Sequence, residues 1–304
     1  MPTATSGIST VTATINGQTY TLTLNSSTGK YEATITAPST SSYNNNAGHY
    51  YPVSLTATDV AGNSVTVNDQ HATLGSSLRL QVKETTAPTI SSVTPSNNSF
   101  IATSTPTITA QLRDNDSGID ISTLVVKVDN VAVSSGSITT TAVSGGYNMS
   151  YTTSALADGA HTITIKVSDN DGNESATAST TINIATTAPT LTITAPTDGL
   201  ATKISSLTVS GTTNADATVT VQLNSGSPQS ATVGSGGAFS KTVTLSTEGE
   251  NTITIVATNP AGVTTTVTKT VIYDTTAPVF TSIVISPNPA TTGNTYTITV
   301  EVTD

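Results

Sequence analysis

The sequence contains no cysteine and no tryptophan, and only 9% of its 304 residues are charged. Without cysteine, the chain has no disulfide framework, no thiolate nucleophile and no cysteine-bound metal. Nine Lys and Arg residues against 19 Asp and Glu residues give a formal net charge of -10, which is the wrong sign for neutralising nucleic-acid phosphates. No apolar run approaches the ~20 residues of a membrane-spanning helix. The sequence therefore predicts neither a nucleic-acid partner nor a membrane partner.

The first six residues have neither the basic region nor the apolar region of a signal peptide. If Met1 is the natural start, we expect a chain that is made and assembled in the cytoplasm. The absence of cysteine is typical of a virion part or of an extracellular product of Gram-positive bacteria. We therefore expect a virion or an extracellular appendage, with a bacterial cell surface as the alternative location.

One phrase, Thr-Thr-Ala-Pro, occurs three times, ending at Pro88, Pro189 and Pro278. Its spacing is close to the ~100 residues of an immunoglobulin-type sandwich. Between these phrases, Val and Ile alternate with Thr in short runs bounded by Gly, Asn and Pro, a pattern that predicts strands. No stretch has the 3.6-residue period of an amphipathic helix, so the sequence predicts an all-β fold. The third repeat gives the clearest predicted strands: 207–211, 218–223, 239–245, 252–258 and 264–272.

A strand followed by a Gly turn precedes the end of each repeat. The turns read Asp59-Val60-Ala61-Gly62-Asn63, Asp169-Asn170-Asp171-Gly172-Asn173 and Asn259-Pro260-Ala261-Gly262. Together with the Thr-Thr-Ala-Pro phrase, they resemble tandem bacterial immunoglobulin-like (Big-type) domains. Segments 6–17 and 112–120 are similar to immunoglobulin-like proteins of phages and prophages of Gram-positive bacteria. The resemblance implies β-sandwiches in a rod-like array with an incomplete sandwich at each end, divided as 1–86, 87–187, 188–276 and 277–304.

The two incomplete units are complementary. The unit 1–86 begins with Ser6-Gly7-Ile8, which matches Ser117-Gly118-Ile119 after the second strand of the next unit, whereas 277–304 contains only the first two strands. We hypothesise that this hairpin fills the gap in another copy, as in donor-strand complementation, and builds a filament or a ring. Alternatively, residues 60–84 fill the gap, or the chain is cut within a domain. The predicted assembly residues are Val279, Phe280, Ile283, Ile285, Tyr296, Ile298, Val300 and Val302.

Acidic side chains gather in two loops of the second unit. In a sandwich of this type the two loops emerge at the same end, and Ca²⁺ takes 6–8 oxygen ligands in irregular geometry. We therefore expect Ca²⁺ there, or else ordinary turn-forming residues that cap their own backbone. No other cofactor is predicted. The candidate ligands are Asp114, Asp116, Asp120, Asp169 and Asp171.

A loop rich in Tyr and Asn has the chemistry of an antibody paratope. Its Tyr43, Tyr50 and Tyr51 form a candidate recognition patch, or else they pack against one another. Aromatic residues make up only 4% of the chain, which argues against a sugar-cleaving cleft, and the three histidines lie in no catalytic motif. We predict no catalytic residues and no enzyme.

These observations predict a structural or adhesive protein that assembles head to tail as a filament, a virion appendage or a tail component. Its expected partners are copies of itself, other virion proteins and host cell-surface glycans. The alternatives are a stalk or adhesion fragment of a bacterial surface protein, and an accessory module of a secreted polysaccharide hydrolase.

Overall fold

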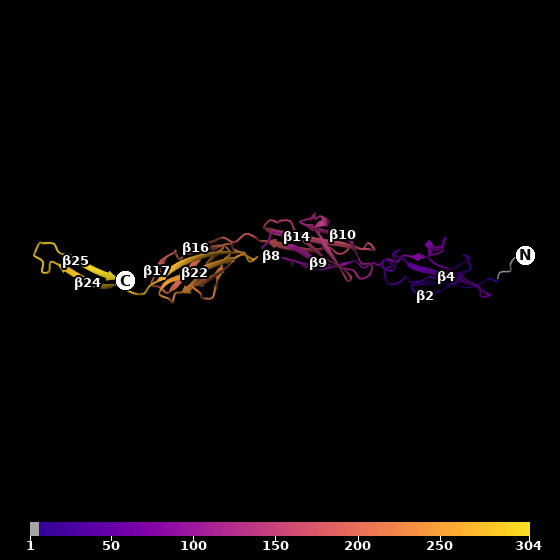
Figure 1. The fold of residues 1–304 in the computed structure, drawn as a ribbon, viewed down its shortest axis with the longest axis horizontal. Helices are drawn as coiled ribbons and strands as arrows, with labels where there is room; N and C mark the ends of the chain where they lie inside the picture. Colours follow the sequence, from indigo (N-terminus) through magenta and orange to yellow (C-terminus); the bar gives the residue numbers. More distant parts are fainter. Residues whose placement is uncertain (1–5) are drawn as a thin grey trace. The chain divides into compact units, whose positions relative to one another are not determined.

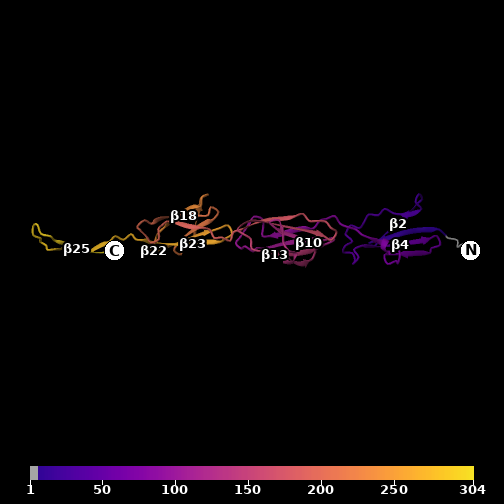
Figure 2. The ribbon, with the colours of Figure 1, turned by 90° about the horizontal axis from the view of Figure 1, so that it is seen from above.

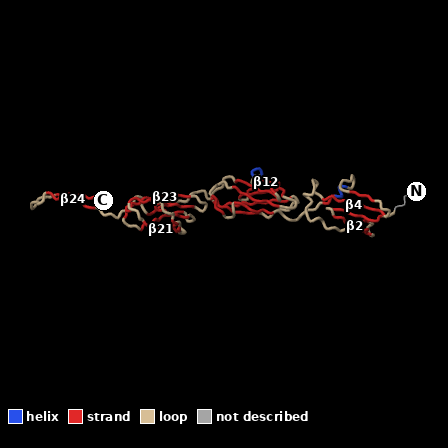
Figure 3. The backbone as a smooth tube through the Cα atoms, turned by 60° about the horizontal axis from the view of Figure 1, so that its bottom comes forward, coloured by secondary structure: helices blue, strands red, loops and turns tan. Residues whose placement is uncertain are grey.

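The computed structural model describes residues 6–304, which fold almost entirely as strands and loops (Figure 1). Residues 1–5, which belong to the segment unlike a signal peptide, lie outside the described residues. The helical turns in the described part are two short 3₁₀ turns, η1 (Gly75–Leu78) and η2 (Ser135–Ser137), drawn in blue in Figure 3. No helix within residues 6–304 is long and apolar enough to cross a membrane. The all-β prediction is confirmed.

The chain divides into two compact units. The first comprises residues up to Ser99 together with Ser104–Asn183, and the second comprises Phe100–Thr103 together with Ile184–Asp304. The first unit contains two β-domains in sequence, which we call the first and second domains. The second unit contains the third domain and the hairpin that follows it.

The first domain is a single sheet in the strand order β3-β2-β1-β4-β5, with β6 also pairing with β4. The central pair is antiparallel and places Ala13 opposite Leu55. The alternation of Thr with apolar residues gives each strand one polar and one apolar face. The strands are β1 (Ile8–Ile15), β2 (Gln18–Asn25), β3 (Lys30–Glu32), β4 (Tyr51–Asp59), β5 (Ser64–Val67) and β6 (Arg79–Leu80).

The second domain has two sheets, in the orders β11-β10-β14-β15-β8 and β12-β13-β9-β7 (Figures 1 and 2). Apolar side chains from both sheets are buried between them, as in an immunoglobulin-type sandwich. Its strands are β7 (Thr89–Thr94), β8 (Ser99–Ile101), β9 (Thr107–Arg113), β10 (Ile119–Val128), β11 (Val131–Ala132), β12 (Thr139–Val143), β13 (Gly146–Thr152), β14 (Gly159–Asp169) and β15 (Ala178–Ile184).

The third domain joins its two layers through one strand. Its order is β16-β18-β21-β20-β19-β22-β23-β17, because β20 pairs with β19 in one layer and with β21 in the other. The core between the layers contains Val209, Phe239, Ile253 and Ile255. Its strands are β16 (Leu191–Ala195), β17 (Leu200–Thr202), β18 (Ser206–Thr213), β19 (Thr218–Leu223), β20 (Gln229–Val233), β21 (Ala238–Thr244), β22 (Gly249–Thr258) and β23 (Thr264–Tyr273).

A two-stranded hairpin follows the third domain. It consists of β24 (Val279–Ser286) and β25 (Thr297–Thr303), and these strands pair with each other alone in the described structure. Every residue of both strands is exposed. A two-stranded hairpin is marginally stable in water at best, so this element is a poor candidate for an independent folding unit.

Candidate functional site

The first domain leaves the apolar face of its sheet uncovered. Among its described residues, the buried apolar side chains are Ala13, Tyr51 and Leu78. The second domain, of similar length, has a far larger core, because a second sheet lies over the first. Its buried apolar side chains are Ile108, Ala110, Leu112, Ile119, Val126, Met149, Tyr151, Ile163, Ile165, Val167, Ile182 and Ile184.

A groove of about 420 Å³ lies on this uncovered face. Ile15, Tyr20, Ile35 and Leu80 line it, and all four are only half-buried. Ala33 and Thr36 also line the groove, and residues 33–36 have no strand partner in the described structure. By sequence they match the part of β13 that pairs with β9 in the second domain. The groove is therefore the place where a strand equivalent to β9 would lie.

Residues 60–84 do not occupy that place. Their strands β5 and β6 both pair with β4, in the sheet that already exists. Leu78 is buried, and the Ser42 backbone N–H donates a hydrogen bond to Val82 O at 2.8 Å. The segment thus extends the existing sheet and holds the loop before β4 in place. It does not form a second sheet over the apolar face in the described structure.

The β24–β25 hairpin has the register of the β7–β9 pair in the second domain. Val279 lies opposite Thr303 and Phe280 opposite Val302, as Thr89 lies opposite Arg113 and Ile90 opposite Leu112. In both pairs an irregularity in register follows these positions. The hairpin therefore has the same strand pairing as the first two strands of the second domain.

The hairpin differs from the β7–β9 pair in having no sheet packed against its apolar side in the described structure. Three residues of β9 that face the core of the second domain are between 0% and 2% exposed, whereas their counterparts in β25 are between 46% and 56% exposed. The predicted assembly residues thus lie on a formed hairpin that has no second layer to cover it. The buried set is Ile108, Ala110 and Leu112, and the exposed set is Ile298, Val300 and Val302.

A second candidate site lies at the start of the second domain. Oxygen atoms of Glu84, Asp114 and Asp169 all lie within 4.8 Å of one another. Asp114 follows β9, Asp169 ends β14, and Glu84 comes from the segment between the first and second domains. Asp114 and Asp169 are buried, with 7% and 2% of their surfaces exposed. The sequence analysis predicted these two aspartates but missed Glu84, which becomes a neighbour only through the fold.

Backbone N–H groups hold the three carboxylates in place. Asp114 Oδ1 accepts hydrogen bonds from the N–H groups of Asp116 and Gly118, at 3.0 and 2.8 Å. Asp169 Oδ1 accepts from Asp171 and Asn173, at 2.9 and 2.8 Å. Both are Asx-type turns, in which a short acidic side chain caps its own loop.

Glu84, which lies in the linker, is held by the loop that contains Asp114. Glu84 Oε1 accepts a hydrogen bond from the Ser117 N–H at 2.7 Å. Burial raises the pKa of Glu84, while the hydrogen bond from the Ser117 N–H opposes that shift. The three carboxylates are therefore fixed at one point, where Asn173 Nδ2 also donates to Asp169 Oδ2 at 2.7 Å.

No basic side chain forms an ion pair with this cluster in the described part of the chain. Lys83 instead donates to Asp171 O at 3.1 Å, and Arg113 donates to the carbonyls of Leu112 and Tyr147. Two unit charges within 4.8 Å of each other repel by about 3.5 kcal/mol or more at an effective dielectric constant of ~20. The cluster is thus a point of uncompensated negative charge.

The other predicted Ca²⁺ ligands have different partners. Both carboxylate oxygens of Asp116 accept from the Ser41 N–H of the first domain, at 2.9 and 3.0 Å. Asp171 Oδ2 accepts from the Glu84 N–H at 3.0 Å. Asp120 Oδ1 accepts from the N–H and the hydroxyl of Ser122. Asp116 and Asp171 therefore fasten the first domain and its linker to the second domain, and Asp120 caps a local turn.

The predicted recognition loop is largely held by internal contacts. Tyr43 stacks on His49 with ring centroids 4.1 Å apart, and the Tyr50 hydroxyl donates to Asp69 at 2.8 Å. The prediction for Tyr51 is wrong, because this residue is 4% exposed and its hydroxyl is bonded to Thr40 Oγ1. Tyr51 belongs to the small core of the first domain and cannot contact a ligand.

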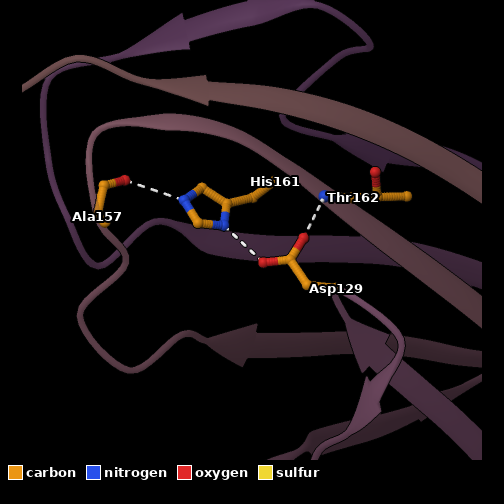
Figure 4. Close-up of polar contacts among 4 residues, drawn as sticks. All are labelled: Asp129, Ala157, His161 and Thr162. Atoms are coloured by element: carbon orange, nitrogen blue, oxygen red, sulfur yellow. Dashed lines mark hydrogen bonds and ion pairs between the residues drawn. The ribbon is translucent and has the colours of Figure 1, made fainter.

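His161 is part of a clamp at the opposite end of the second domain (Figure 4). Its Nδ1 lies 2.7 Å from Asp129 Oδ2, and its Nε2 lies 2.9 Å from Ala157 O. The other Asp129 oxygen accepts from the Thr162 N–H at 2.9 Å. These contacts tie the β10–β11 turn to β14, which is a structural role.

The paired sheets and their strand orders define the chain as a tandem immunoglobulin-like β-sandwich protein. Residues 88–165 match the family model of the bacterial Ig domain, and residues 189–275 match the model of glucodextranase domain B. The second domain is therefore similar to the bacterial Ig domain, and the predicted resemblance to bacterial immunoglobulin-like domains is confirmed. Domains of this kind are typically non-catalytic and are usually found outside the cell or on its surface.

Several solved structures are similar to the chain. The fibronectin(III)-like modules of Clostridium thermocellum CbhA match with 16% identity over 62% of this chain and 94% of theirs, at a TM-score of 0.38. A three-domain titin structure matches with 13% identity over 90% of each chain, at a TM-score of 0.37. A protocadherin gammaB7 structure matches with 15% identity over 94% of this chain and 74% of its own, at a TM-score of 0.32. Among curated proteins the chain has no match.

Proposed function

We propose that this protein is a structural subunit that assembles head to tail by strand complementation. The β24–β25 hairpin of one copy supplies the two missing strands of the first domain of the next copy. The observation that carries the proposal is the match between the two elements: an apolar sheet face with a groove where β9 would lie, and a hairpin in the register of β7–β9 with its core-facing side chains exposed.

The energetic reason is the hydrophobic effect. Each large apolar side chain that moves from water into a core contributes about 1.5–3 kcal/mol, and the hairpin has several that are half or more exposed. A strand beside residues 33–36 would also pair backbone groups that have no ladder partner. Because donor and acceptor are different surfaces, the contact repeats from copy to copy and builds a filament, or a ring if it closes.

The assembly would be a virion appendage, a tail component or a surface filament. Other virion proteins and host cell-surface glycans are its proposed partners. Immunoglobulin-like domains serve here as rigid spacers between the complementation points, and no catalytic step is part of the proposed role.

The test uses variants of the full chain. Ile298→Asp places a charge on the core-facing side of β25, whereas Thr299→Asp places the same charge on the other side of the same strand. We expect light scattering on a sizing column to show concentration-dependent oligomers for the wild type and for Thr299→Asp, and a monomer for Ile298→Asp. A wild type that stays monomeric at all concentrations, or two variants that behave alike, would contradict the proposal.

A mixing experiment identifies the two surfaces directly. Ile35→Asp blocks the groove, and Ile298→Asp blocks the hairpin. Each variant alone should be monomeric, and an equimolar mixture should form pairs that grow no further, because each pair joins the one intact groove to the one intact hairpin. Growth of the mixture into longer oligomers would mean that another surface mediates assembly.

A second candidate function is an accessory module of a polysaccharide-degrading enzyme. The match of residues 189–275 to glucodextranase domain B favours it. Affinity electrophoresis in gels containing soluble glucans tests it, with retardation of the wild type as the supporting result. This function and assembly can be separated, because Ile298→Asp should leave any glucan retardation unchanged.

A further inference from the structure

We propose that Ca²⁺ binds to Glu84, Asp114 and Asp169 and fixes the linker before the second domain to the loops of that domain. The proposal is independent of the assembly described above, since all three ligands lie within one copy of the chain. It differs from the sequence-based prediction in its ligand set, which gains Glu84 and loses Asp116, Asp120 and Asp171.

The spacing of the oxygens suits a single ion. Ca²⁺ binds oxygen at 2.3–2.6 Å, so two oxygens on opposite sides of one ion lie at most about 5 Å apart. The ligand atoms of the three carboxylates lie within 4.8 Å of one another. One ion can therefore touch all three without a change in the loops, and it supplies the positive charge that the site lacks.

A buried hydroxyl points to the same place. Ser117 is 0% exposed, and its Oγ forms no hydrogen bond in the described structure. A buried polar atom without a partner is costly. Ser117 lies between the aspartates of its own loop and Glu84, to which its N–H is bonded, and its side chain faces the Glu84 carboxylate. An ion with its bound water at this point would give the hydroxyl a partner.

The third domain provides an internal comparison. Ala185 precedes the Thr-Thr-Ala-Pro phrase of the third domain as Glu84 precedes that of the second. Asn214 follows β18 as Asp114 follows β9, and Asn259 begins the Gly turn after β22 as Asp169 begins the turn after β14. All three acidic side chains are thus replaced by neutral ones together. In the third domain, Asn259 Nδ2 donates to the linker carbonyls of Ala185 and Thr187, at 3.1 and 3.0 Å. In the second domain Asn173 Nδ2 likewise donates to the linker carbonyl of Glu84, at 3.3 Å, beside the three carboxylates that the third domain lacks.

The chemistry of the site selects the ion. All its side-chain donors are oxygens, with no His or Cys, which suits a hard cation. The three carboxylates sit on two loops and a linker, and Ca²⁺ tolerates such irregular arrangements better than Mg²⁺, which requires a near-ideal octahedron. Asp114 also lines open clefts of about 500 and 370 Å³, so an ion can reach it from solvent.

Calorimetric titration of the full chain with CaCl₂ tests the proposal. We expect one site per chain in the wild type and in Asp120→Asn, whose carboxylate lies in the same region but bonds only locally. Glu84→Gln should weaken binding at least about tenfold, because the ligand charge sets the affinity of such sites, and Asp169→Asn should abolish it. Glu84→Gln keeps an oxygen that can accept the Ser117 N–H, so its fold should survive.

Thermal unfolding gives a second measurement. Wild type and Asp120→Asn should melt at a lower temperature in EDTA than in CaCl₂, whereas Glu84→Gln should show a smaller difference. A wild type with no heat of Ca²⁺ binding and the same melting temperature in both buffers would overturn the proposal. Equal binding of MgCl₂ would overturn the assignment to Ca²⁺, and undiminished binding by Glu84→Gln would overturn the ligand set.

Discussion

His161 in the second domain and Asn251 in the third domain occupy the same position and make the same kind of clamp. His161 bonds to Asp129 and to Ala157 O, whereas Asn251 bonds to Asn224 and to Thr247 O. In each domain the partner side chain also accepts from the next backbone N–H, that of Thr162 or Thr252. One hydrogen-bond pattern is thus built once from charged and once from neutral residues.

The charged version should make the stability of the second domain depend on pH. Both ring nitrogens of His161 face acceptors, so both bonds require the protonated imidazolium. The hydrogen bond to Asp129 raises the pKa of His161, and the same bond lowers the pKa of Asp129. The stabilisation is therefore complete below about pH 6.5 and above about pH 4, and it is lost as pH rises through the raised pKa of His161.

The matched variant is Asp129→Asn with His161→Asn, which copies the third domain. Between pH 6 and pH 8, the melting transition of the second domain in the wild type should fall by about 2–4 °C, as expected for a partly exposed pair. The double variant should show no such fall. Circular dichroism at a series of pH values measures both, and an equal slope in the two proteins would contradict the role of the clamp.

Adjacent glycines in one turn of the third domain should differ sharply in their tolerance of alanine. Gly237 has φ +80°, and an added Cβ would lie 1.9 Å from Thr213 O, whereas Gly236 has open space around it. Gly237→Ala should lower the free energy of unfolding by about 2 kcal/mol or more, because it combines a left-handed backbone with a clash against a carbonyl. Gly236→Ala should stay within about 0.5 kcal/mol of the wild type. Urea titration of the two variants decides the matter.

The fold was predictable because it depends on local patterns. Alternation of Thr with Val or Ile marks most long strands, and the predicted run 218–223 coincides with β19 (Thr218–Leu223). The strands that the sequence analysis missed in the third domain are β17 and β20. They contain only three and five residues, and such short strands are set by their neighbours in the sheet more than by their own sequence.

The candidate sites were only partly predictable, for a similar reason. Asp114 and Asp169 sit in recognisable turns, so the sequence locates them. Glu84 lies in a linker, and Asp116 reaches Ser41, 75 residues away. These relationships depend on how the first domain meets the second, which no local pattern encodes. The burial of Tyr51 likewise depends on the segment that contains Leu78.

The bond from Asp116 to the first domain should control the mobility of the loop that contains Tyr43. Asp116→Ala removes both hydrogen bonds to the Ser41 N–H, so the loop should open more often while each domain stays folded. Chymotrypsin should then cleave after Tyr43 several-fold faster than in the wild type. Asp120→Ala is the control, since Asp120 bonds only within its own turn. Equal cleavage of the two variants would show that the Asp116 contact does not hold the loop.

Hydrogen exchange should reveal which elements have backbone amides that become protected only when the chains assemble. In a dilute sample, the amides of β24 and β25 should exchange fast, because the hairpin packs against no other strand in the described structure and isolated hairpins are marginal. Amides of β14 and β22 should exchange slowly, since their alternate side chains, such as Ile165 and Ile255, are fully buried. Raising the protein concentration should slow exchange in β24, β25 and residues 33–36 together, and should leave β14 and β22 unchanged.

The same experiment on Ile298→Asp should show fast exchange in the hairpin at every concentration. Protection of the hairpin that is independent of concentration would mean that its partner lies in the same copy of the chain.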